Sequence, residues 1–531
     1  MKSQTFLGGI FVLVIGSLVA KLLGAFYRIP LTWVLGAEGL GIYQLVFPVF
    51  SLLLVLSSTG TPTAISTMVA GRIKEGKYLE AEKIFRISKY SLLIFGIITG
   101  AVLALSSGIL ASIQGNELST YSYVAIAFAV PMVSILSAFR GYYQGCRNMV
   151  PTALSQVVEQ AGKLIFGLIL SFILIPYGIE FGALGAVLGV VLGEILAVII
   201  MYIYKIFNRK KENFKLLIQN NEVADNKLLA KELGKIAMPI VVASFVIPAL
   251  QVIDSMLVVN LLNMGGYNTA EATIMWGINS GVVNSIINMP VVLALAVATA
   301  VVPELSEKTK VIGETAKEKI ASAHNFTINI ALPCVMGLMI LAPLIINFLY
   351  SDSLGTNSAL NEQALATNLL VFSSALILIM ALMQVQNASL QGIGKANIPL
   401  RHIIFAGIIK IVLMIVFVQI REINIYGVFI ANMVFYSICF ILNSVYLWKT
   451  VQVRDCYSKL LPTIVASCVM TLALIMARMA FVNLNVYIAF PIDFVLGVIV
   501  YAWTLLIMGG AGEMVVFIKK FWQKVYKRKV L

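Results

Sequence analysis

Charged side chains inside long apolar segments are the residues of this sequence that could bind a ligand. Lys21 and Arg28 lie seven positions apart in the stretch KLLGAFYRIP, a spacing that places both on one face of a helix. A charge at bilayer depth costs about 2.5–3.5 kcal/mol on insertion scales, so it usually faces protein or a water-filled cavity. We interpret the two cations as one wall of a cavity for an anionic substrate; snorkelling to the membrane surface is the structural alternative.

A second charged group lies in the stretch SQVVEQAGKLIF. Glu159 and Lys163 stand four positions apart, so they can pair on one helix face, and Gln160 adds an amide beside them. A purely structural ion pair is the alternative for these residues. Lys410 occupies the equivalent position in a later segment without an acidic neighbour, which favours a cavity or a bound anion. The predicted cations of the substrate cavity are Lys21, Arg28, Arg140, Lys163 and Lys410.

Two further acids lie within apolar segments. Glu194 follows three glycines at four-residue spacing, a pattern of tight helix packing, so it is either a polar group of the cavity or a cross-helix hydrogen-bonding partner. Asp254, with Asn284 and Asn288 on the next segment, offers oxygens that suit Na⁺ or a proton relay. The alternative for Asp254 is a lone acid bonded to nearby hydroxyls.

The composition is that of a membrane protein. Of 531 residues, 60% are hydrophobic and 12% charged, and the mean hydropathy is +0.95. Apolar runs of about 20 residues, long enough to cross a bilayer, recur throughout. There are two His, and the five Cys show no paired spacing, so no metal or other cofactor is expected. Without a Walker A motif or a long polar segment, the sequence predicts a secondary transporter rather than an enzyme or an ATP-driven pump.

We expect an all-α polytopic fold with both termini in the cytoplasm, because basic residues are concentrated in alternate loops. The net charge of +14 is therefore attributed to topology, and no nucleic-acid partner is expected. About fourteen spans are predicted, at roughly 6–34, 40–70, 90–113, 121–145, 152–176, 181–206, 235–261, 274–302, 323–350, 364–391, 398–420, 424–448, 459–480 and 487–509.

An internal repeat organises these spans. The string YYQGCRNMVPTALSQVVEQAGKLIFGLIL is similar to ASLQGIGKANIPLRHIIFAGIIKIVLMIV, and their Gln-Gly pairs lie 247 positions apart. Each half has six spans in the same orientation, which predicts a parallel repeat with a substrate site between the halves. The predicted domains are an N-terminal lobe (1–207), a cytoplasmic linker (208–234), a C-terminal lobe (235–450), and two extra helices with a basic tail (451–531).

Three strings, TFLGGIFVLVIGSLVAKLLGAFYRIPL, GTPTAISTMVA and FRGYYQGCRNMVPTALSQVVEQ, resemble the polysaccharide-transporter branch of the MOP exporter superfamily. The likeness is to SpoVB/YtgP-like proteins, which are related to MurJ-type lipid II flippases. It implies a V-shaped, MATE-like pair of six-helix lobes with an extra helix pair. The stretch AKLLGAFYR is similar to the SRxLGxxR element of MurJ proteins, whose basic residues line the cavity; Lys21 takes its first basic position and Arg28 lies one residue later than the second.

The resemblance also implies a function. Such proteins move lipid-linked oligosaccharides, above all undecaprenyl-pyrophosphate-linked lipid II, across the bacterial cytoplasmic membrane for peptidoglycan, envelope polysaccharide or spore cortex synthesis. Coupling to Na⁺ or H⁺ and to the membrane potential is expected, as are membrane lipids and envelope-synthesis proteins as partners of a monomer. Two alternatives stay open: a MATE-like cation-coupled drug antiporter, and an envelope-assembly factor that does not transport.

Overall fold

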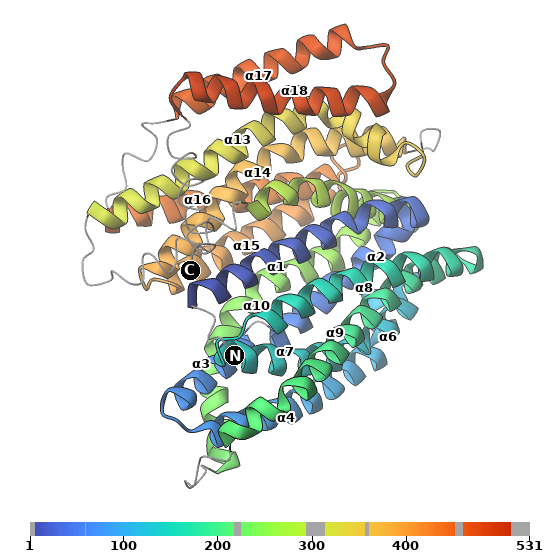
Figure 1. Ribbon diagram of the computed structural model, residues 1–531. Helices are drawn as coiled ribbons and strands as arrows, with labels where there is room; N and C mark the ends of the chain where they lie inside the picture. Colours follow the sequence, from blue (N-terminus) through green and yellow to red (C-terminus); the bar gives the residue numbers. More distant parts are fainter. Residues whose placement is uncertain are drawn as a thin grey trace. The chain divides into compact units, whose positions relative to one another are not determined.

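The computed structural model describes residues 6–58, 60–216, 225–293, 314–355, 360–451 and 460–510. Within these ranges the chain is helical and forms no strand (Figure 1). Packing divides it into two compact units, Met1–Val282 with Ile415–Ile425, and Val283–Met414 with Tyr426–Leu531. The lobes predicted above rest on the sequence repeat rather than on packing, so their boundaries stay a prediction.

The first unit holds the helices that carry most of the predicted site. They are α1 (Phe6–Phe26), α2 (Arg28–Ser58), α3 (Gly60–Lys74), α4 (Tyr78–Leu105), α5 (Ser107–Ile113), α6 (Thr120–Ala127), α7 (Ala129–Gly145), α8 (Val150–Leu174), α9 (Ile179–Leu216), α10 (Asn226–Met264) and α11 (Thr269–Trp276). Short 3₁₀ turns, η1 (Glu117–Ser119) and η2 (Ile175–Tyr177), precede α6 and α9, and a π-helical turn, η3 (Gly277–Val283), follows α11.

The second unit contains α13 (Glu314–Tyr350), α14 (Glu362–Gly392), most of α15 (Asn397–Val418), α16 (Tyr426–Val451), α17 (Leu461–Ala480) and α18 (Val486–Ile507). The last two helices run side by side and pack against α13 (Figure 1). Hydrogen bonds fix this contact, since Tyr501 donates its hydroxyl to the Asn329 carbonyl at 2.6 Å and Thr463 donates to the Asn329 side chain. The extra helix pair is thereby bonded to its own unit.

Twelve segments of the described chain are long and apolar enough to span a membrane, which confirms an all-α, multi-pass membrane protein. The first of them, Ile15–Lys74, contains the predicted span 40–70 and most of the predicted span 6–34. The predicted span 274–302 extends past the described residues, which stop at 293 in this region. These two cases account for the difference between twelve segments and fourteen predicted spans.

The predicted first span, 6–34, is two helices rather than one. Pro30 has no N–H to donate to the carbonyl of Phe26, so the helical bonding is interrupted and α1 ends at Phe26. A second break follows inside α2 at Gly36, whose φ of 65° and ψ of −174° lie outside the helical region. Lys21 and Arg28 therefore lie on either side of a helix break, and the expectation of one continuous helical face is corrected.

Helices α8 and α9 pack backbone to backbone (Figure 1). A Cβ on Gly193 would lie 2.5 Å from the Glu159 carbonyl oxygen, and one on Gly189 would overlap the backbone of Gly167. The glycine stripe predicted to pack tightly does so, because only a hydrogen atom fits between the backbones of the two helices at these positions. This contact fixes the height of Glu194 on α9 relative to Glu159 on α8.

Candidate functional site

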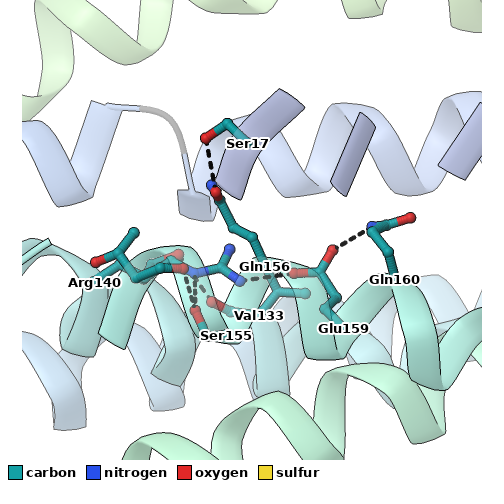
Figure 2. A network of polar contacts seen from close by, with 9 residues as sticks. Ser17, Val133, Arg140, Ser155, Gln156, Glu159 and Gln160 are labelled. Carbon is teal, nitrogen blue, oxygen red and sulfur yellow. Dashed lines mark hydrogen bonds and ion pairs between the residues drawn. The ribbon is translucent and has the colours of Figure 1, made fainter. Parts of the chain in front are cut away.

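Arg140 and Glu159 form the centre of a polar cluster in the first unit. The guanidinium Nη2 of Arg140, on α7, lies 2.8 Å from Oε2 of Glu159 on α8, and its Nε donates to the Ser155 hydroxyl at 3.0 Å. The Gln160 amide donates to the other carboxylate oxygen at 2.8 Å. Figure 2 shows these side chains pointing toward one another. With 15% and 19% of their side-chain surfaces exposed, both charges are largely withdrawn from water and neutralise each other.

The predicted pair of Glu159 with Lys163 does not form, because both oxygens of Glu159 are taken by Arg140 and Gln160. The Lys163 side chain points instead into three aromatic rings. Its Nζ lies 5.0 Å, 5.7 Å and 4.7 Å from the ring centroids of Tyr27, Tyr43 and Phe47.

Lys163 is only 7% exposed, so the negative ring faces replace water around its ammonium group. Within the described chain no carboxylate pairs with it, and its positive charge is solvated by the rings rather than cancelled.

Arg28 approaches the same aromatic group from the start of α2. Its Cζ lies 5.9 Å from the Phe47 centroid, so one ring has the cations of Arg28 and Lys163 near it. The rings of Tyr43 and Phe47 stack at 5.7 Å, and Tyr27 meets Tyr43 edge-on at 6.3 Å. The aromatic box, defined here as Tyr27, Tyr43 and Phe47, therefore holds two positive charges on the first unit.

Lys21 differs from the other cations of the cluster. It is exposed and makes no hydrogen bond or ion pair with any residue that the structure describes. Ser17, one turn earlier on α1, donates to the Gln156 side chain on α8 at 2.8 Å (Figure 2). Because residues four apart share a helix face, Lys21 lies on the side of α1 that turns toward the polar row of α8.

Glu194 lies behind this cluster on α9. It is 3% exposed, and its Oε2 makes no hydrogen bond within the described chain, so the cross-helix hydrogen bond considered above is absent there. The charged groups that act on it are Glu159, Arg140 and Lys163. The burial of this carboxyl oxygen is therefore not compensated by a hydrogen bond within the described chain.

The second unit repeats one element of this arrangement. Lys410 on α15 is 5% exposed, and its Nζ lies 5.6 Å from the ring centroid of Phe435 on α16. A polar chain lies nearby in the same unit, since Asn443 donates to Asn387 at 2.8 Å and its oxygen lies 2.8 Å from Nδ1 of His402. The two lysines matched by the sequence repeat are thus both buried over aromatic rings.

The predicted ion-binding residues fall in different units. Asp254 is buried on α10 of the first unit, whereas Asn284 and Asn288 follow η3 in the second. The Asn288 amide donates to the Asn284 backbone carbonyl at 2.6 Å. An ion site shared by these residues stays a prediction. Among the described residues, no group of three His, Cys, Asp or Glu side chains is placed to hold a metal.

Sequence reasoning missed two features of the charged interior. The aromatic box is formed by residues 27, 43 and 47. Their spacing does not predict that the three rings lie together unless the helix breaks at Tyr27 and Gly36 are known. Asp493 lies inside α18, fully buried, and neither carboxylate oxygen bonds to a described residue. Its position in the apolar string IAFPIDFVLG was the available signal, the same one that identified Asp254.

Comparisons with known proteins agree with the fold. The family described as "Polysaccharide biosynthesis protein" matches residues 6–308. The lipid II flippase MurJ of Bacillus subtilis (strain 168) is 27% identical over 440 residues, 79% of this chain and 78% of that protein. Stage V sporulation protein B of the same organism is 27% identical over 311 residues, 58% of this chain and 59% of that protein.

Solved structures share the architecture at lower identity. A lipid II flippase MurJ in an inward closed conformation has a TM-score of 0.69 at 16% identity, covering 94% of this chain and 98% of that one. An inward-facing multidrug resistance MATE family transporter of the MOP superfamily has a TM-score of 0.62 at 17% identity, covering 82% and 96%. At such identities the likeness concerns the fold alone.

Proposed function

The chain belongs to the polysaccharide biosynthesis protein family, within the polysaccharide-transporter branch of the MOP superfamily, and from this premise we propose that it is a flippase for a lipid-linked oligosaccharide. Its favoured substrate is undecaprenyl-pyrophosphate-linked lipid II, carried across the bacterial cytoplasmic membrane by alternating access. Similarity to a lipid II flippase over 79% of the chain supports this choice. Similarity to a sporulation protein leaves spore cortex synthesis as a second setting for the same transport.

The observation that carries the proposal is Lys21, an exposed cation within an apolar helix that no described residue neutralises. The first unit also carries Arg28, Arg140 and Lys163, against the carboxyl groups of Glu159 and Glu194. Positive charge therefore exceeds negative charge in the cluster. A pyrophosphate supplies the missing anion, and Lys21 is the group that can reach it without first breaking an internal contact.

The same charge balance separates the flippase from a drug antiporter. A cation-exporting MATE-like protein needs carboxylates that dominate its binding cavity, whereas Glu159 is already paired with Arg140 and Glu194 is buried. An inside-negative membrane potential favours outward movement of an anionic headgroup by about 2.3 kcal/mol per charge per 100 mV. The potential alone therefore drives the outward step, and Na⁺ or H⁺ at Asp254 serves to reset the carrier.

The remaining parts of the proposal concern its setting. Both termini lie in the cytoplasm, as the basic loops favour, and the protein acts as a monomer in contact with membrane lipids and envelope-synthesis proteins. Chemistry on the sugar is left to other proteins, since the cluster offers binding groups but no nucleophile poised by a base.

The test is complementation of cells depleted of their lipid II flippase, with the outer-face accessibility of the precursor as readout. The double variant Lys21→Ala/Arg28→Ala should accumulate normally and fail to export. The matched control, Lys74→Ala/Lys395→Ala, removes two exposed lysines away from the cluster and should export like the wild type.

Each outcome has a meaning. Normal export by the double variant refutes the cationic grip on the substrate. Failure of the wild-type chain to export any lipid-linked precursor, with drug efflux present, favours the antiporter. A wild-type chain that supports envelope assembly without moving precursor is the non-transporting factor.

A further inference from the structure

A basic cavity of about 840 Å³ lies in the first unit, apart from the polar cluster of α1, α7 and α8. It is formed by the first turns of α4 and of α10, which pack against each other. The residues that line it are Leu79, Glu82, Lys83, Arg86, Ile87, Tyr90, Ser91, Asn226, Lys227 and Ala230. Its volume is in the range of ligand pockets, about 300–1,000 Å³.

Positive charge dominates the polar end of this cavity. Its one carboxylate, Glu82, is bound by Lys205, whose Nζ lies 3.0 Å from each carboxylate oxygen. Arg86 lies 3.6 Å from Glu82, yet 68% of its side chain is exposed, so its guanidinium can turn to a ligand. Lys83 and Lys227 add two more cations to the lining, and Glu82 is already neutralised from outside the cavity. The cavity is therefore suited to an anion.

The other end of the cavity continues into an apolar face. Ile87 and Tyr90 line it, and one turn further along α4 the same face carries Ile94, followed by Ile97 and Ile98. The side chains of Tyr90, Ile94, Ile97 and Ile98 are 58%, 57%, 52% and 57% exposed. Because α4 is one of the apolar segments that can span a membrane, this face meets acyl chains.

A ligand that fills both ends has an anionic head and an apolar tail. A free phosphate would leave the apolar wall without a partner, and a zwitterionic lipid would bring no net negative charge to a lining in which cations outnumber the one carboxylate. We propose that the cavity between α4 and α10 is a binding site for an anionic glycerophospholipid, with its phosphate held by Lys83, Arg86 and Lys227 and its acyl chains lying along α4. Basic pockets between membrane helices on the cytoplasmic side commonly hold such headgroups.

The site is independent of the transported substrate, so it can be tested without a transport assay. Native mass spectrometry of the full chain in detergent, titrated with phosphatidylglycerol, gives an apparent affinity. Parallel titrations use phosphatidylcholine, undecaprenyl pyrophosphate and inorganic pyrophosphate. The variant Lys83→Gln/Arg86→Gln/Lys227→Gln removes the three cations. The matched control, Lys74→Gln/Lys235→Gln/Lys395→Gln, removes three exposed lysines that do not line the cavity.

Phosphatidylglycerol should bind the wild type and the control variant equally, and the cavity variant at least about tenfold more weakly, because three cations that attract the phosphate are gone. The charge-conserving variant Lys83→Arg/Arg86→Lys/Lys227→Arg should retain binding, which separates loss of charge from loss of folding. Equal binding by the cavity variant overturns the proposal. So does phosphatidylcholine binding as strong as that of phosphatidylglycerol.

Undecaprenyl pyrophosphate and inorganic pyrophosphate test whether the ligand of the cavity is something other than a phospholipid. If undecaprenyl pyrophosphate binds in a manner sensitive to the cavity variant and phosphatidylglycerol does not, the cavity belongs to the substrate path and the phospholipid assignment fails. If inorganic pyrophosphate competes fully at equal concentration, the site is one for small anions and the assignment likewise fails. Either result leaves the flippase proposal standing, since its test depends on Lys21 and Arg28.

Discussion

Replacing Glu159 by glutamine removes the negative charge that faces Arg140 at 2.8 Å while preserving the shape of the side chain. Removing one partner of a buried ion pair costs about 3–5 kcal/mol, because the other charge stays buried without compensation. Here 15% and 19% of the two side chains remain exposed, and Arg140 keeps its bond to Ser155. We therefore expect the free energy of unfolding to fall by about 2–4 kcal/mol in Glu159→Gln.

A second variant also removes the positive charge that Glu159→Gln leaves on Arg140 without a partner carboxylate. In Arg140→Met/Glu159→Gln no uncompensated guanidinium remains, so the double variant should regain at least half of the lost stability, with a coupling energy of about 1–3 kcal/mol. Denaturant unfolding in detergent micelles measures all three values. Glu117→Gln makes the same chemical change at an exposed glutamate without an ion pair and should alter stability by less than about 0.5 kcal/mol.

Two results would refute this reasoning. If the free energy of unfolding of Glu159→Gln lies within about 0.5 kcal/mol of the wild-type value, leaving Arg140 without its carboxylate carries no large cost. If the double variant is no more stable than the single one, the cost does not come from the charge left on Arg140.

Three other predictions concern single positions. Lys163→Met should fold as the wild type, because methionine fills the aromatic box without a charge, yet lose precursor export; Lys163→Glu should fail to accumulate, since ring faces repel an anion. Gly193→Val should cost about 3 kcal/mol or more in unfolding free energy, because its Cβ meets the Glu159 carbonyl at 2.5 Å, whereas Gly108→Val meets no atom within 4 Å and should be tolerated. Asp493→Asn should unfold at a temperature at least as high as that of the wild type, because it removes a buried carboxyl that bonds to no described residue.

The spans could be predicted from the sequence because lipid imposes a length and a composition on each. Spans predicted at 152–176 and 364–391 correspond to α8 (Val150–Leu174) and α14 (Glu362–Gly392). The span predicted at 90–113 began too late, since α4 starts at Tyr78. Hydropathy locates the apolar part of a helix, whereas helical hydrogen bonding continues into the basic turns at the membrane surface.

The site was predictable in its residue types but not in its pairings. Four-residue spacing put Lys163 within reach of Glu159, yet reach does not decide between partners. Arg140 comes from another helix and bonds to both Ser155 and Glu159, so Arg140 rather than Lys163 pairs with the carboxylate. That choice depends on how α7 packs against α8, which no local pattern encodes. The aromatic box likewise depends on tertiary packing, since Tyr27, between α1 and α2, meets Lys163 of α8.

The glycine contact between α8 and α9 also has a mechanical consequence. With Gly189 against Gly167 and Gly193 against the Glu159 carbonyl, neither helix can slide or roll without driving backbone into backbone. This backbone contact fixes the position of Glu194 on α9 relative to Glu159 and Lys163 on α8. The helical bonding of the first unit is interrupted at Pro30 and Gly36, in the segment of α1 and α2 that carries Lys21 and Arg28. Bending within this unit is therefore expected at Pro30 and Gly36, close in sequence to Lys21 and Arg28, rather than between α8 and α9.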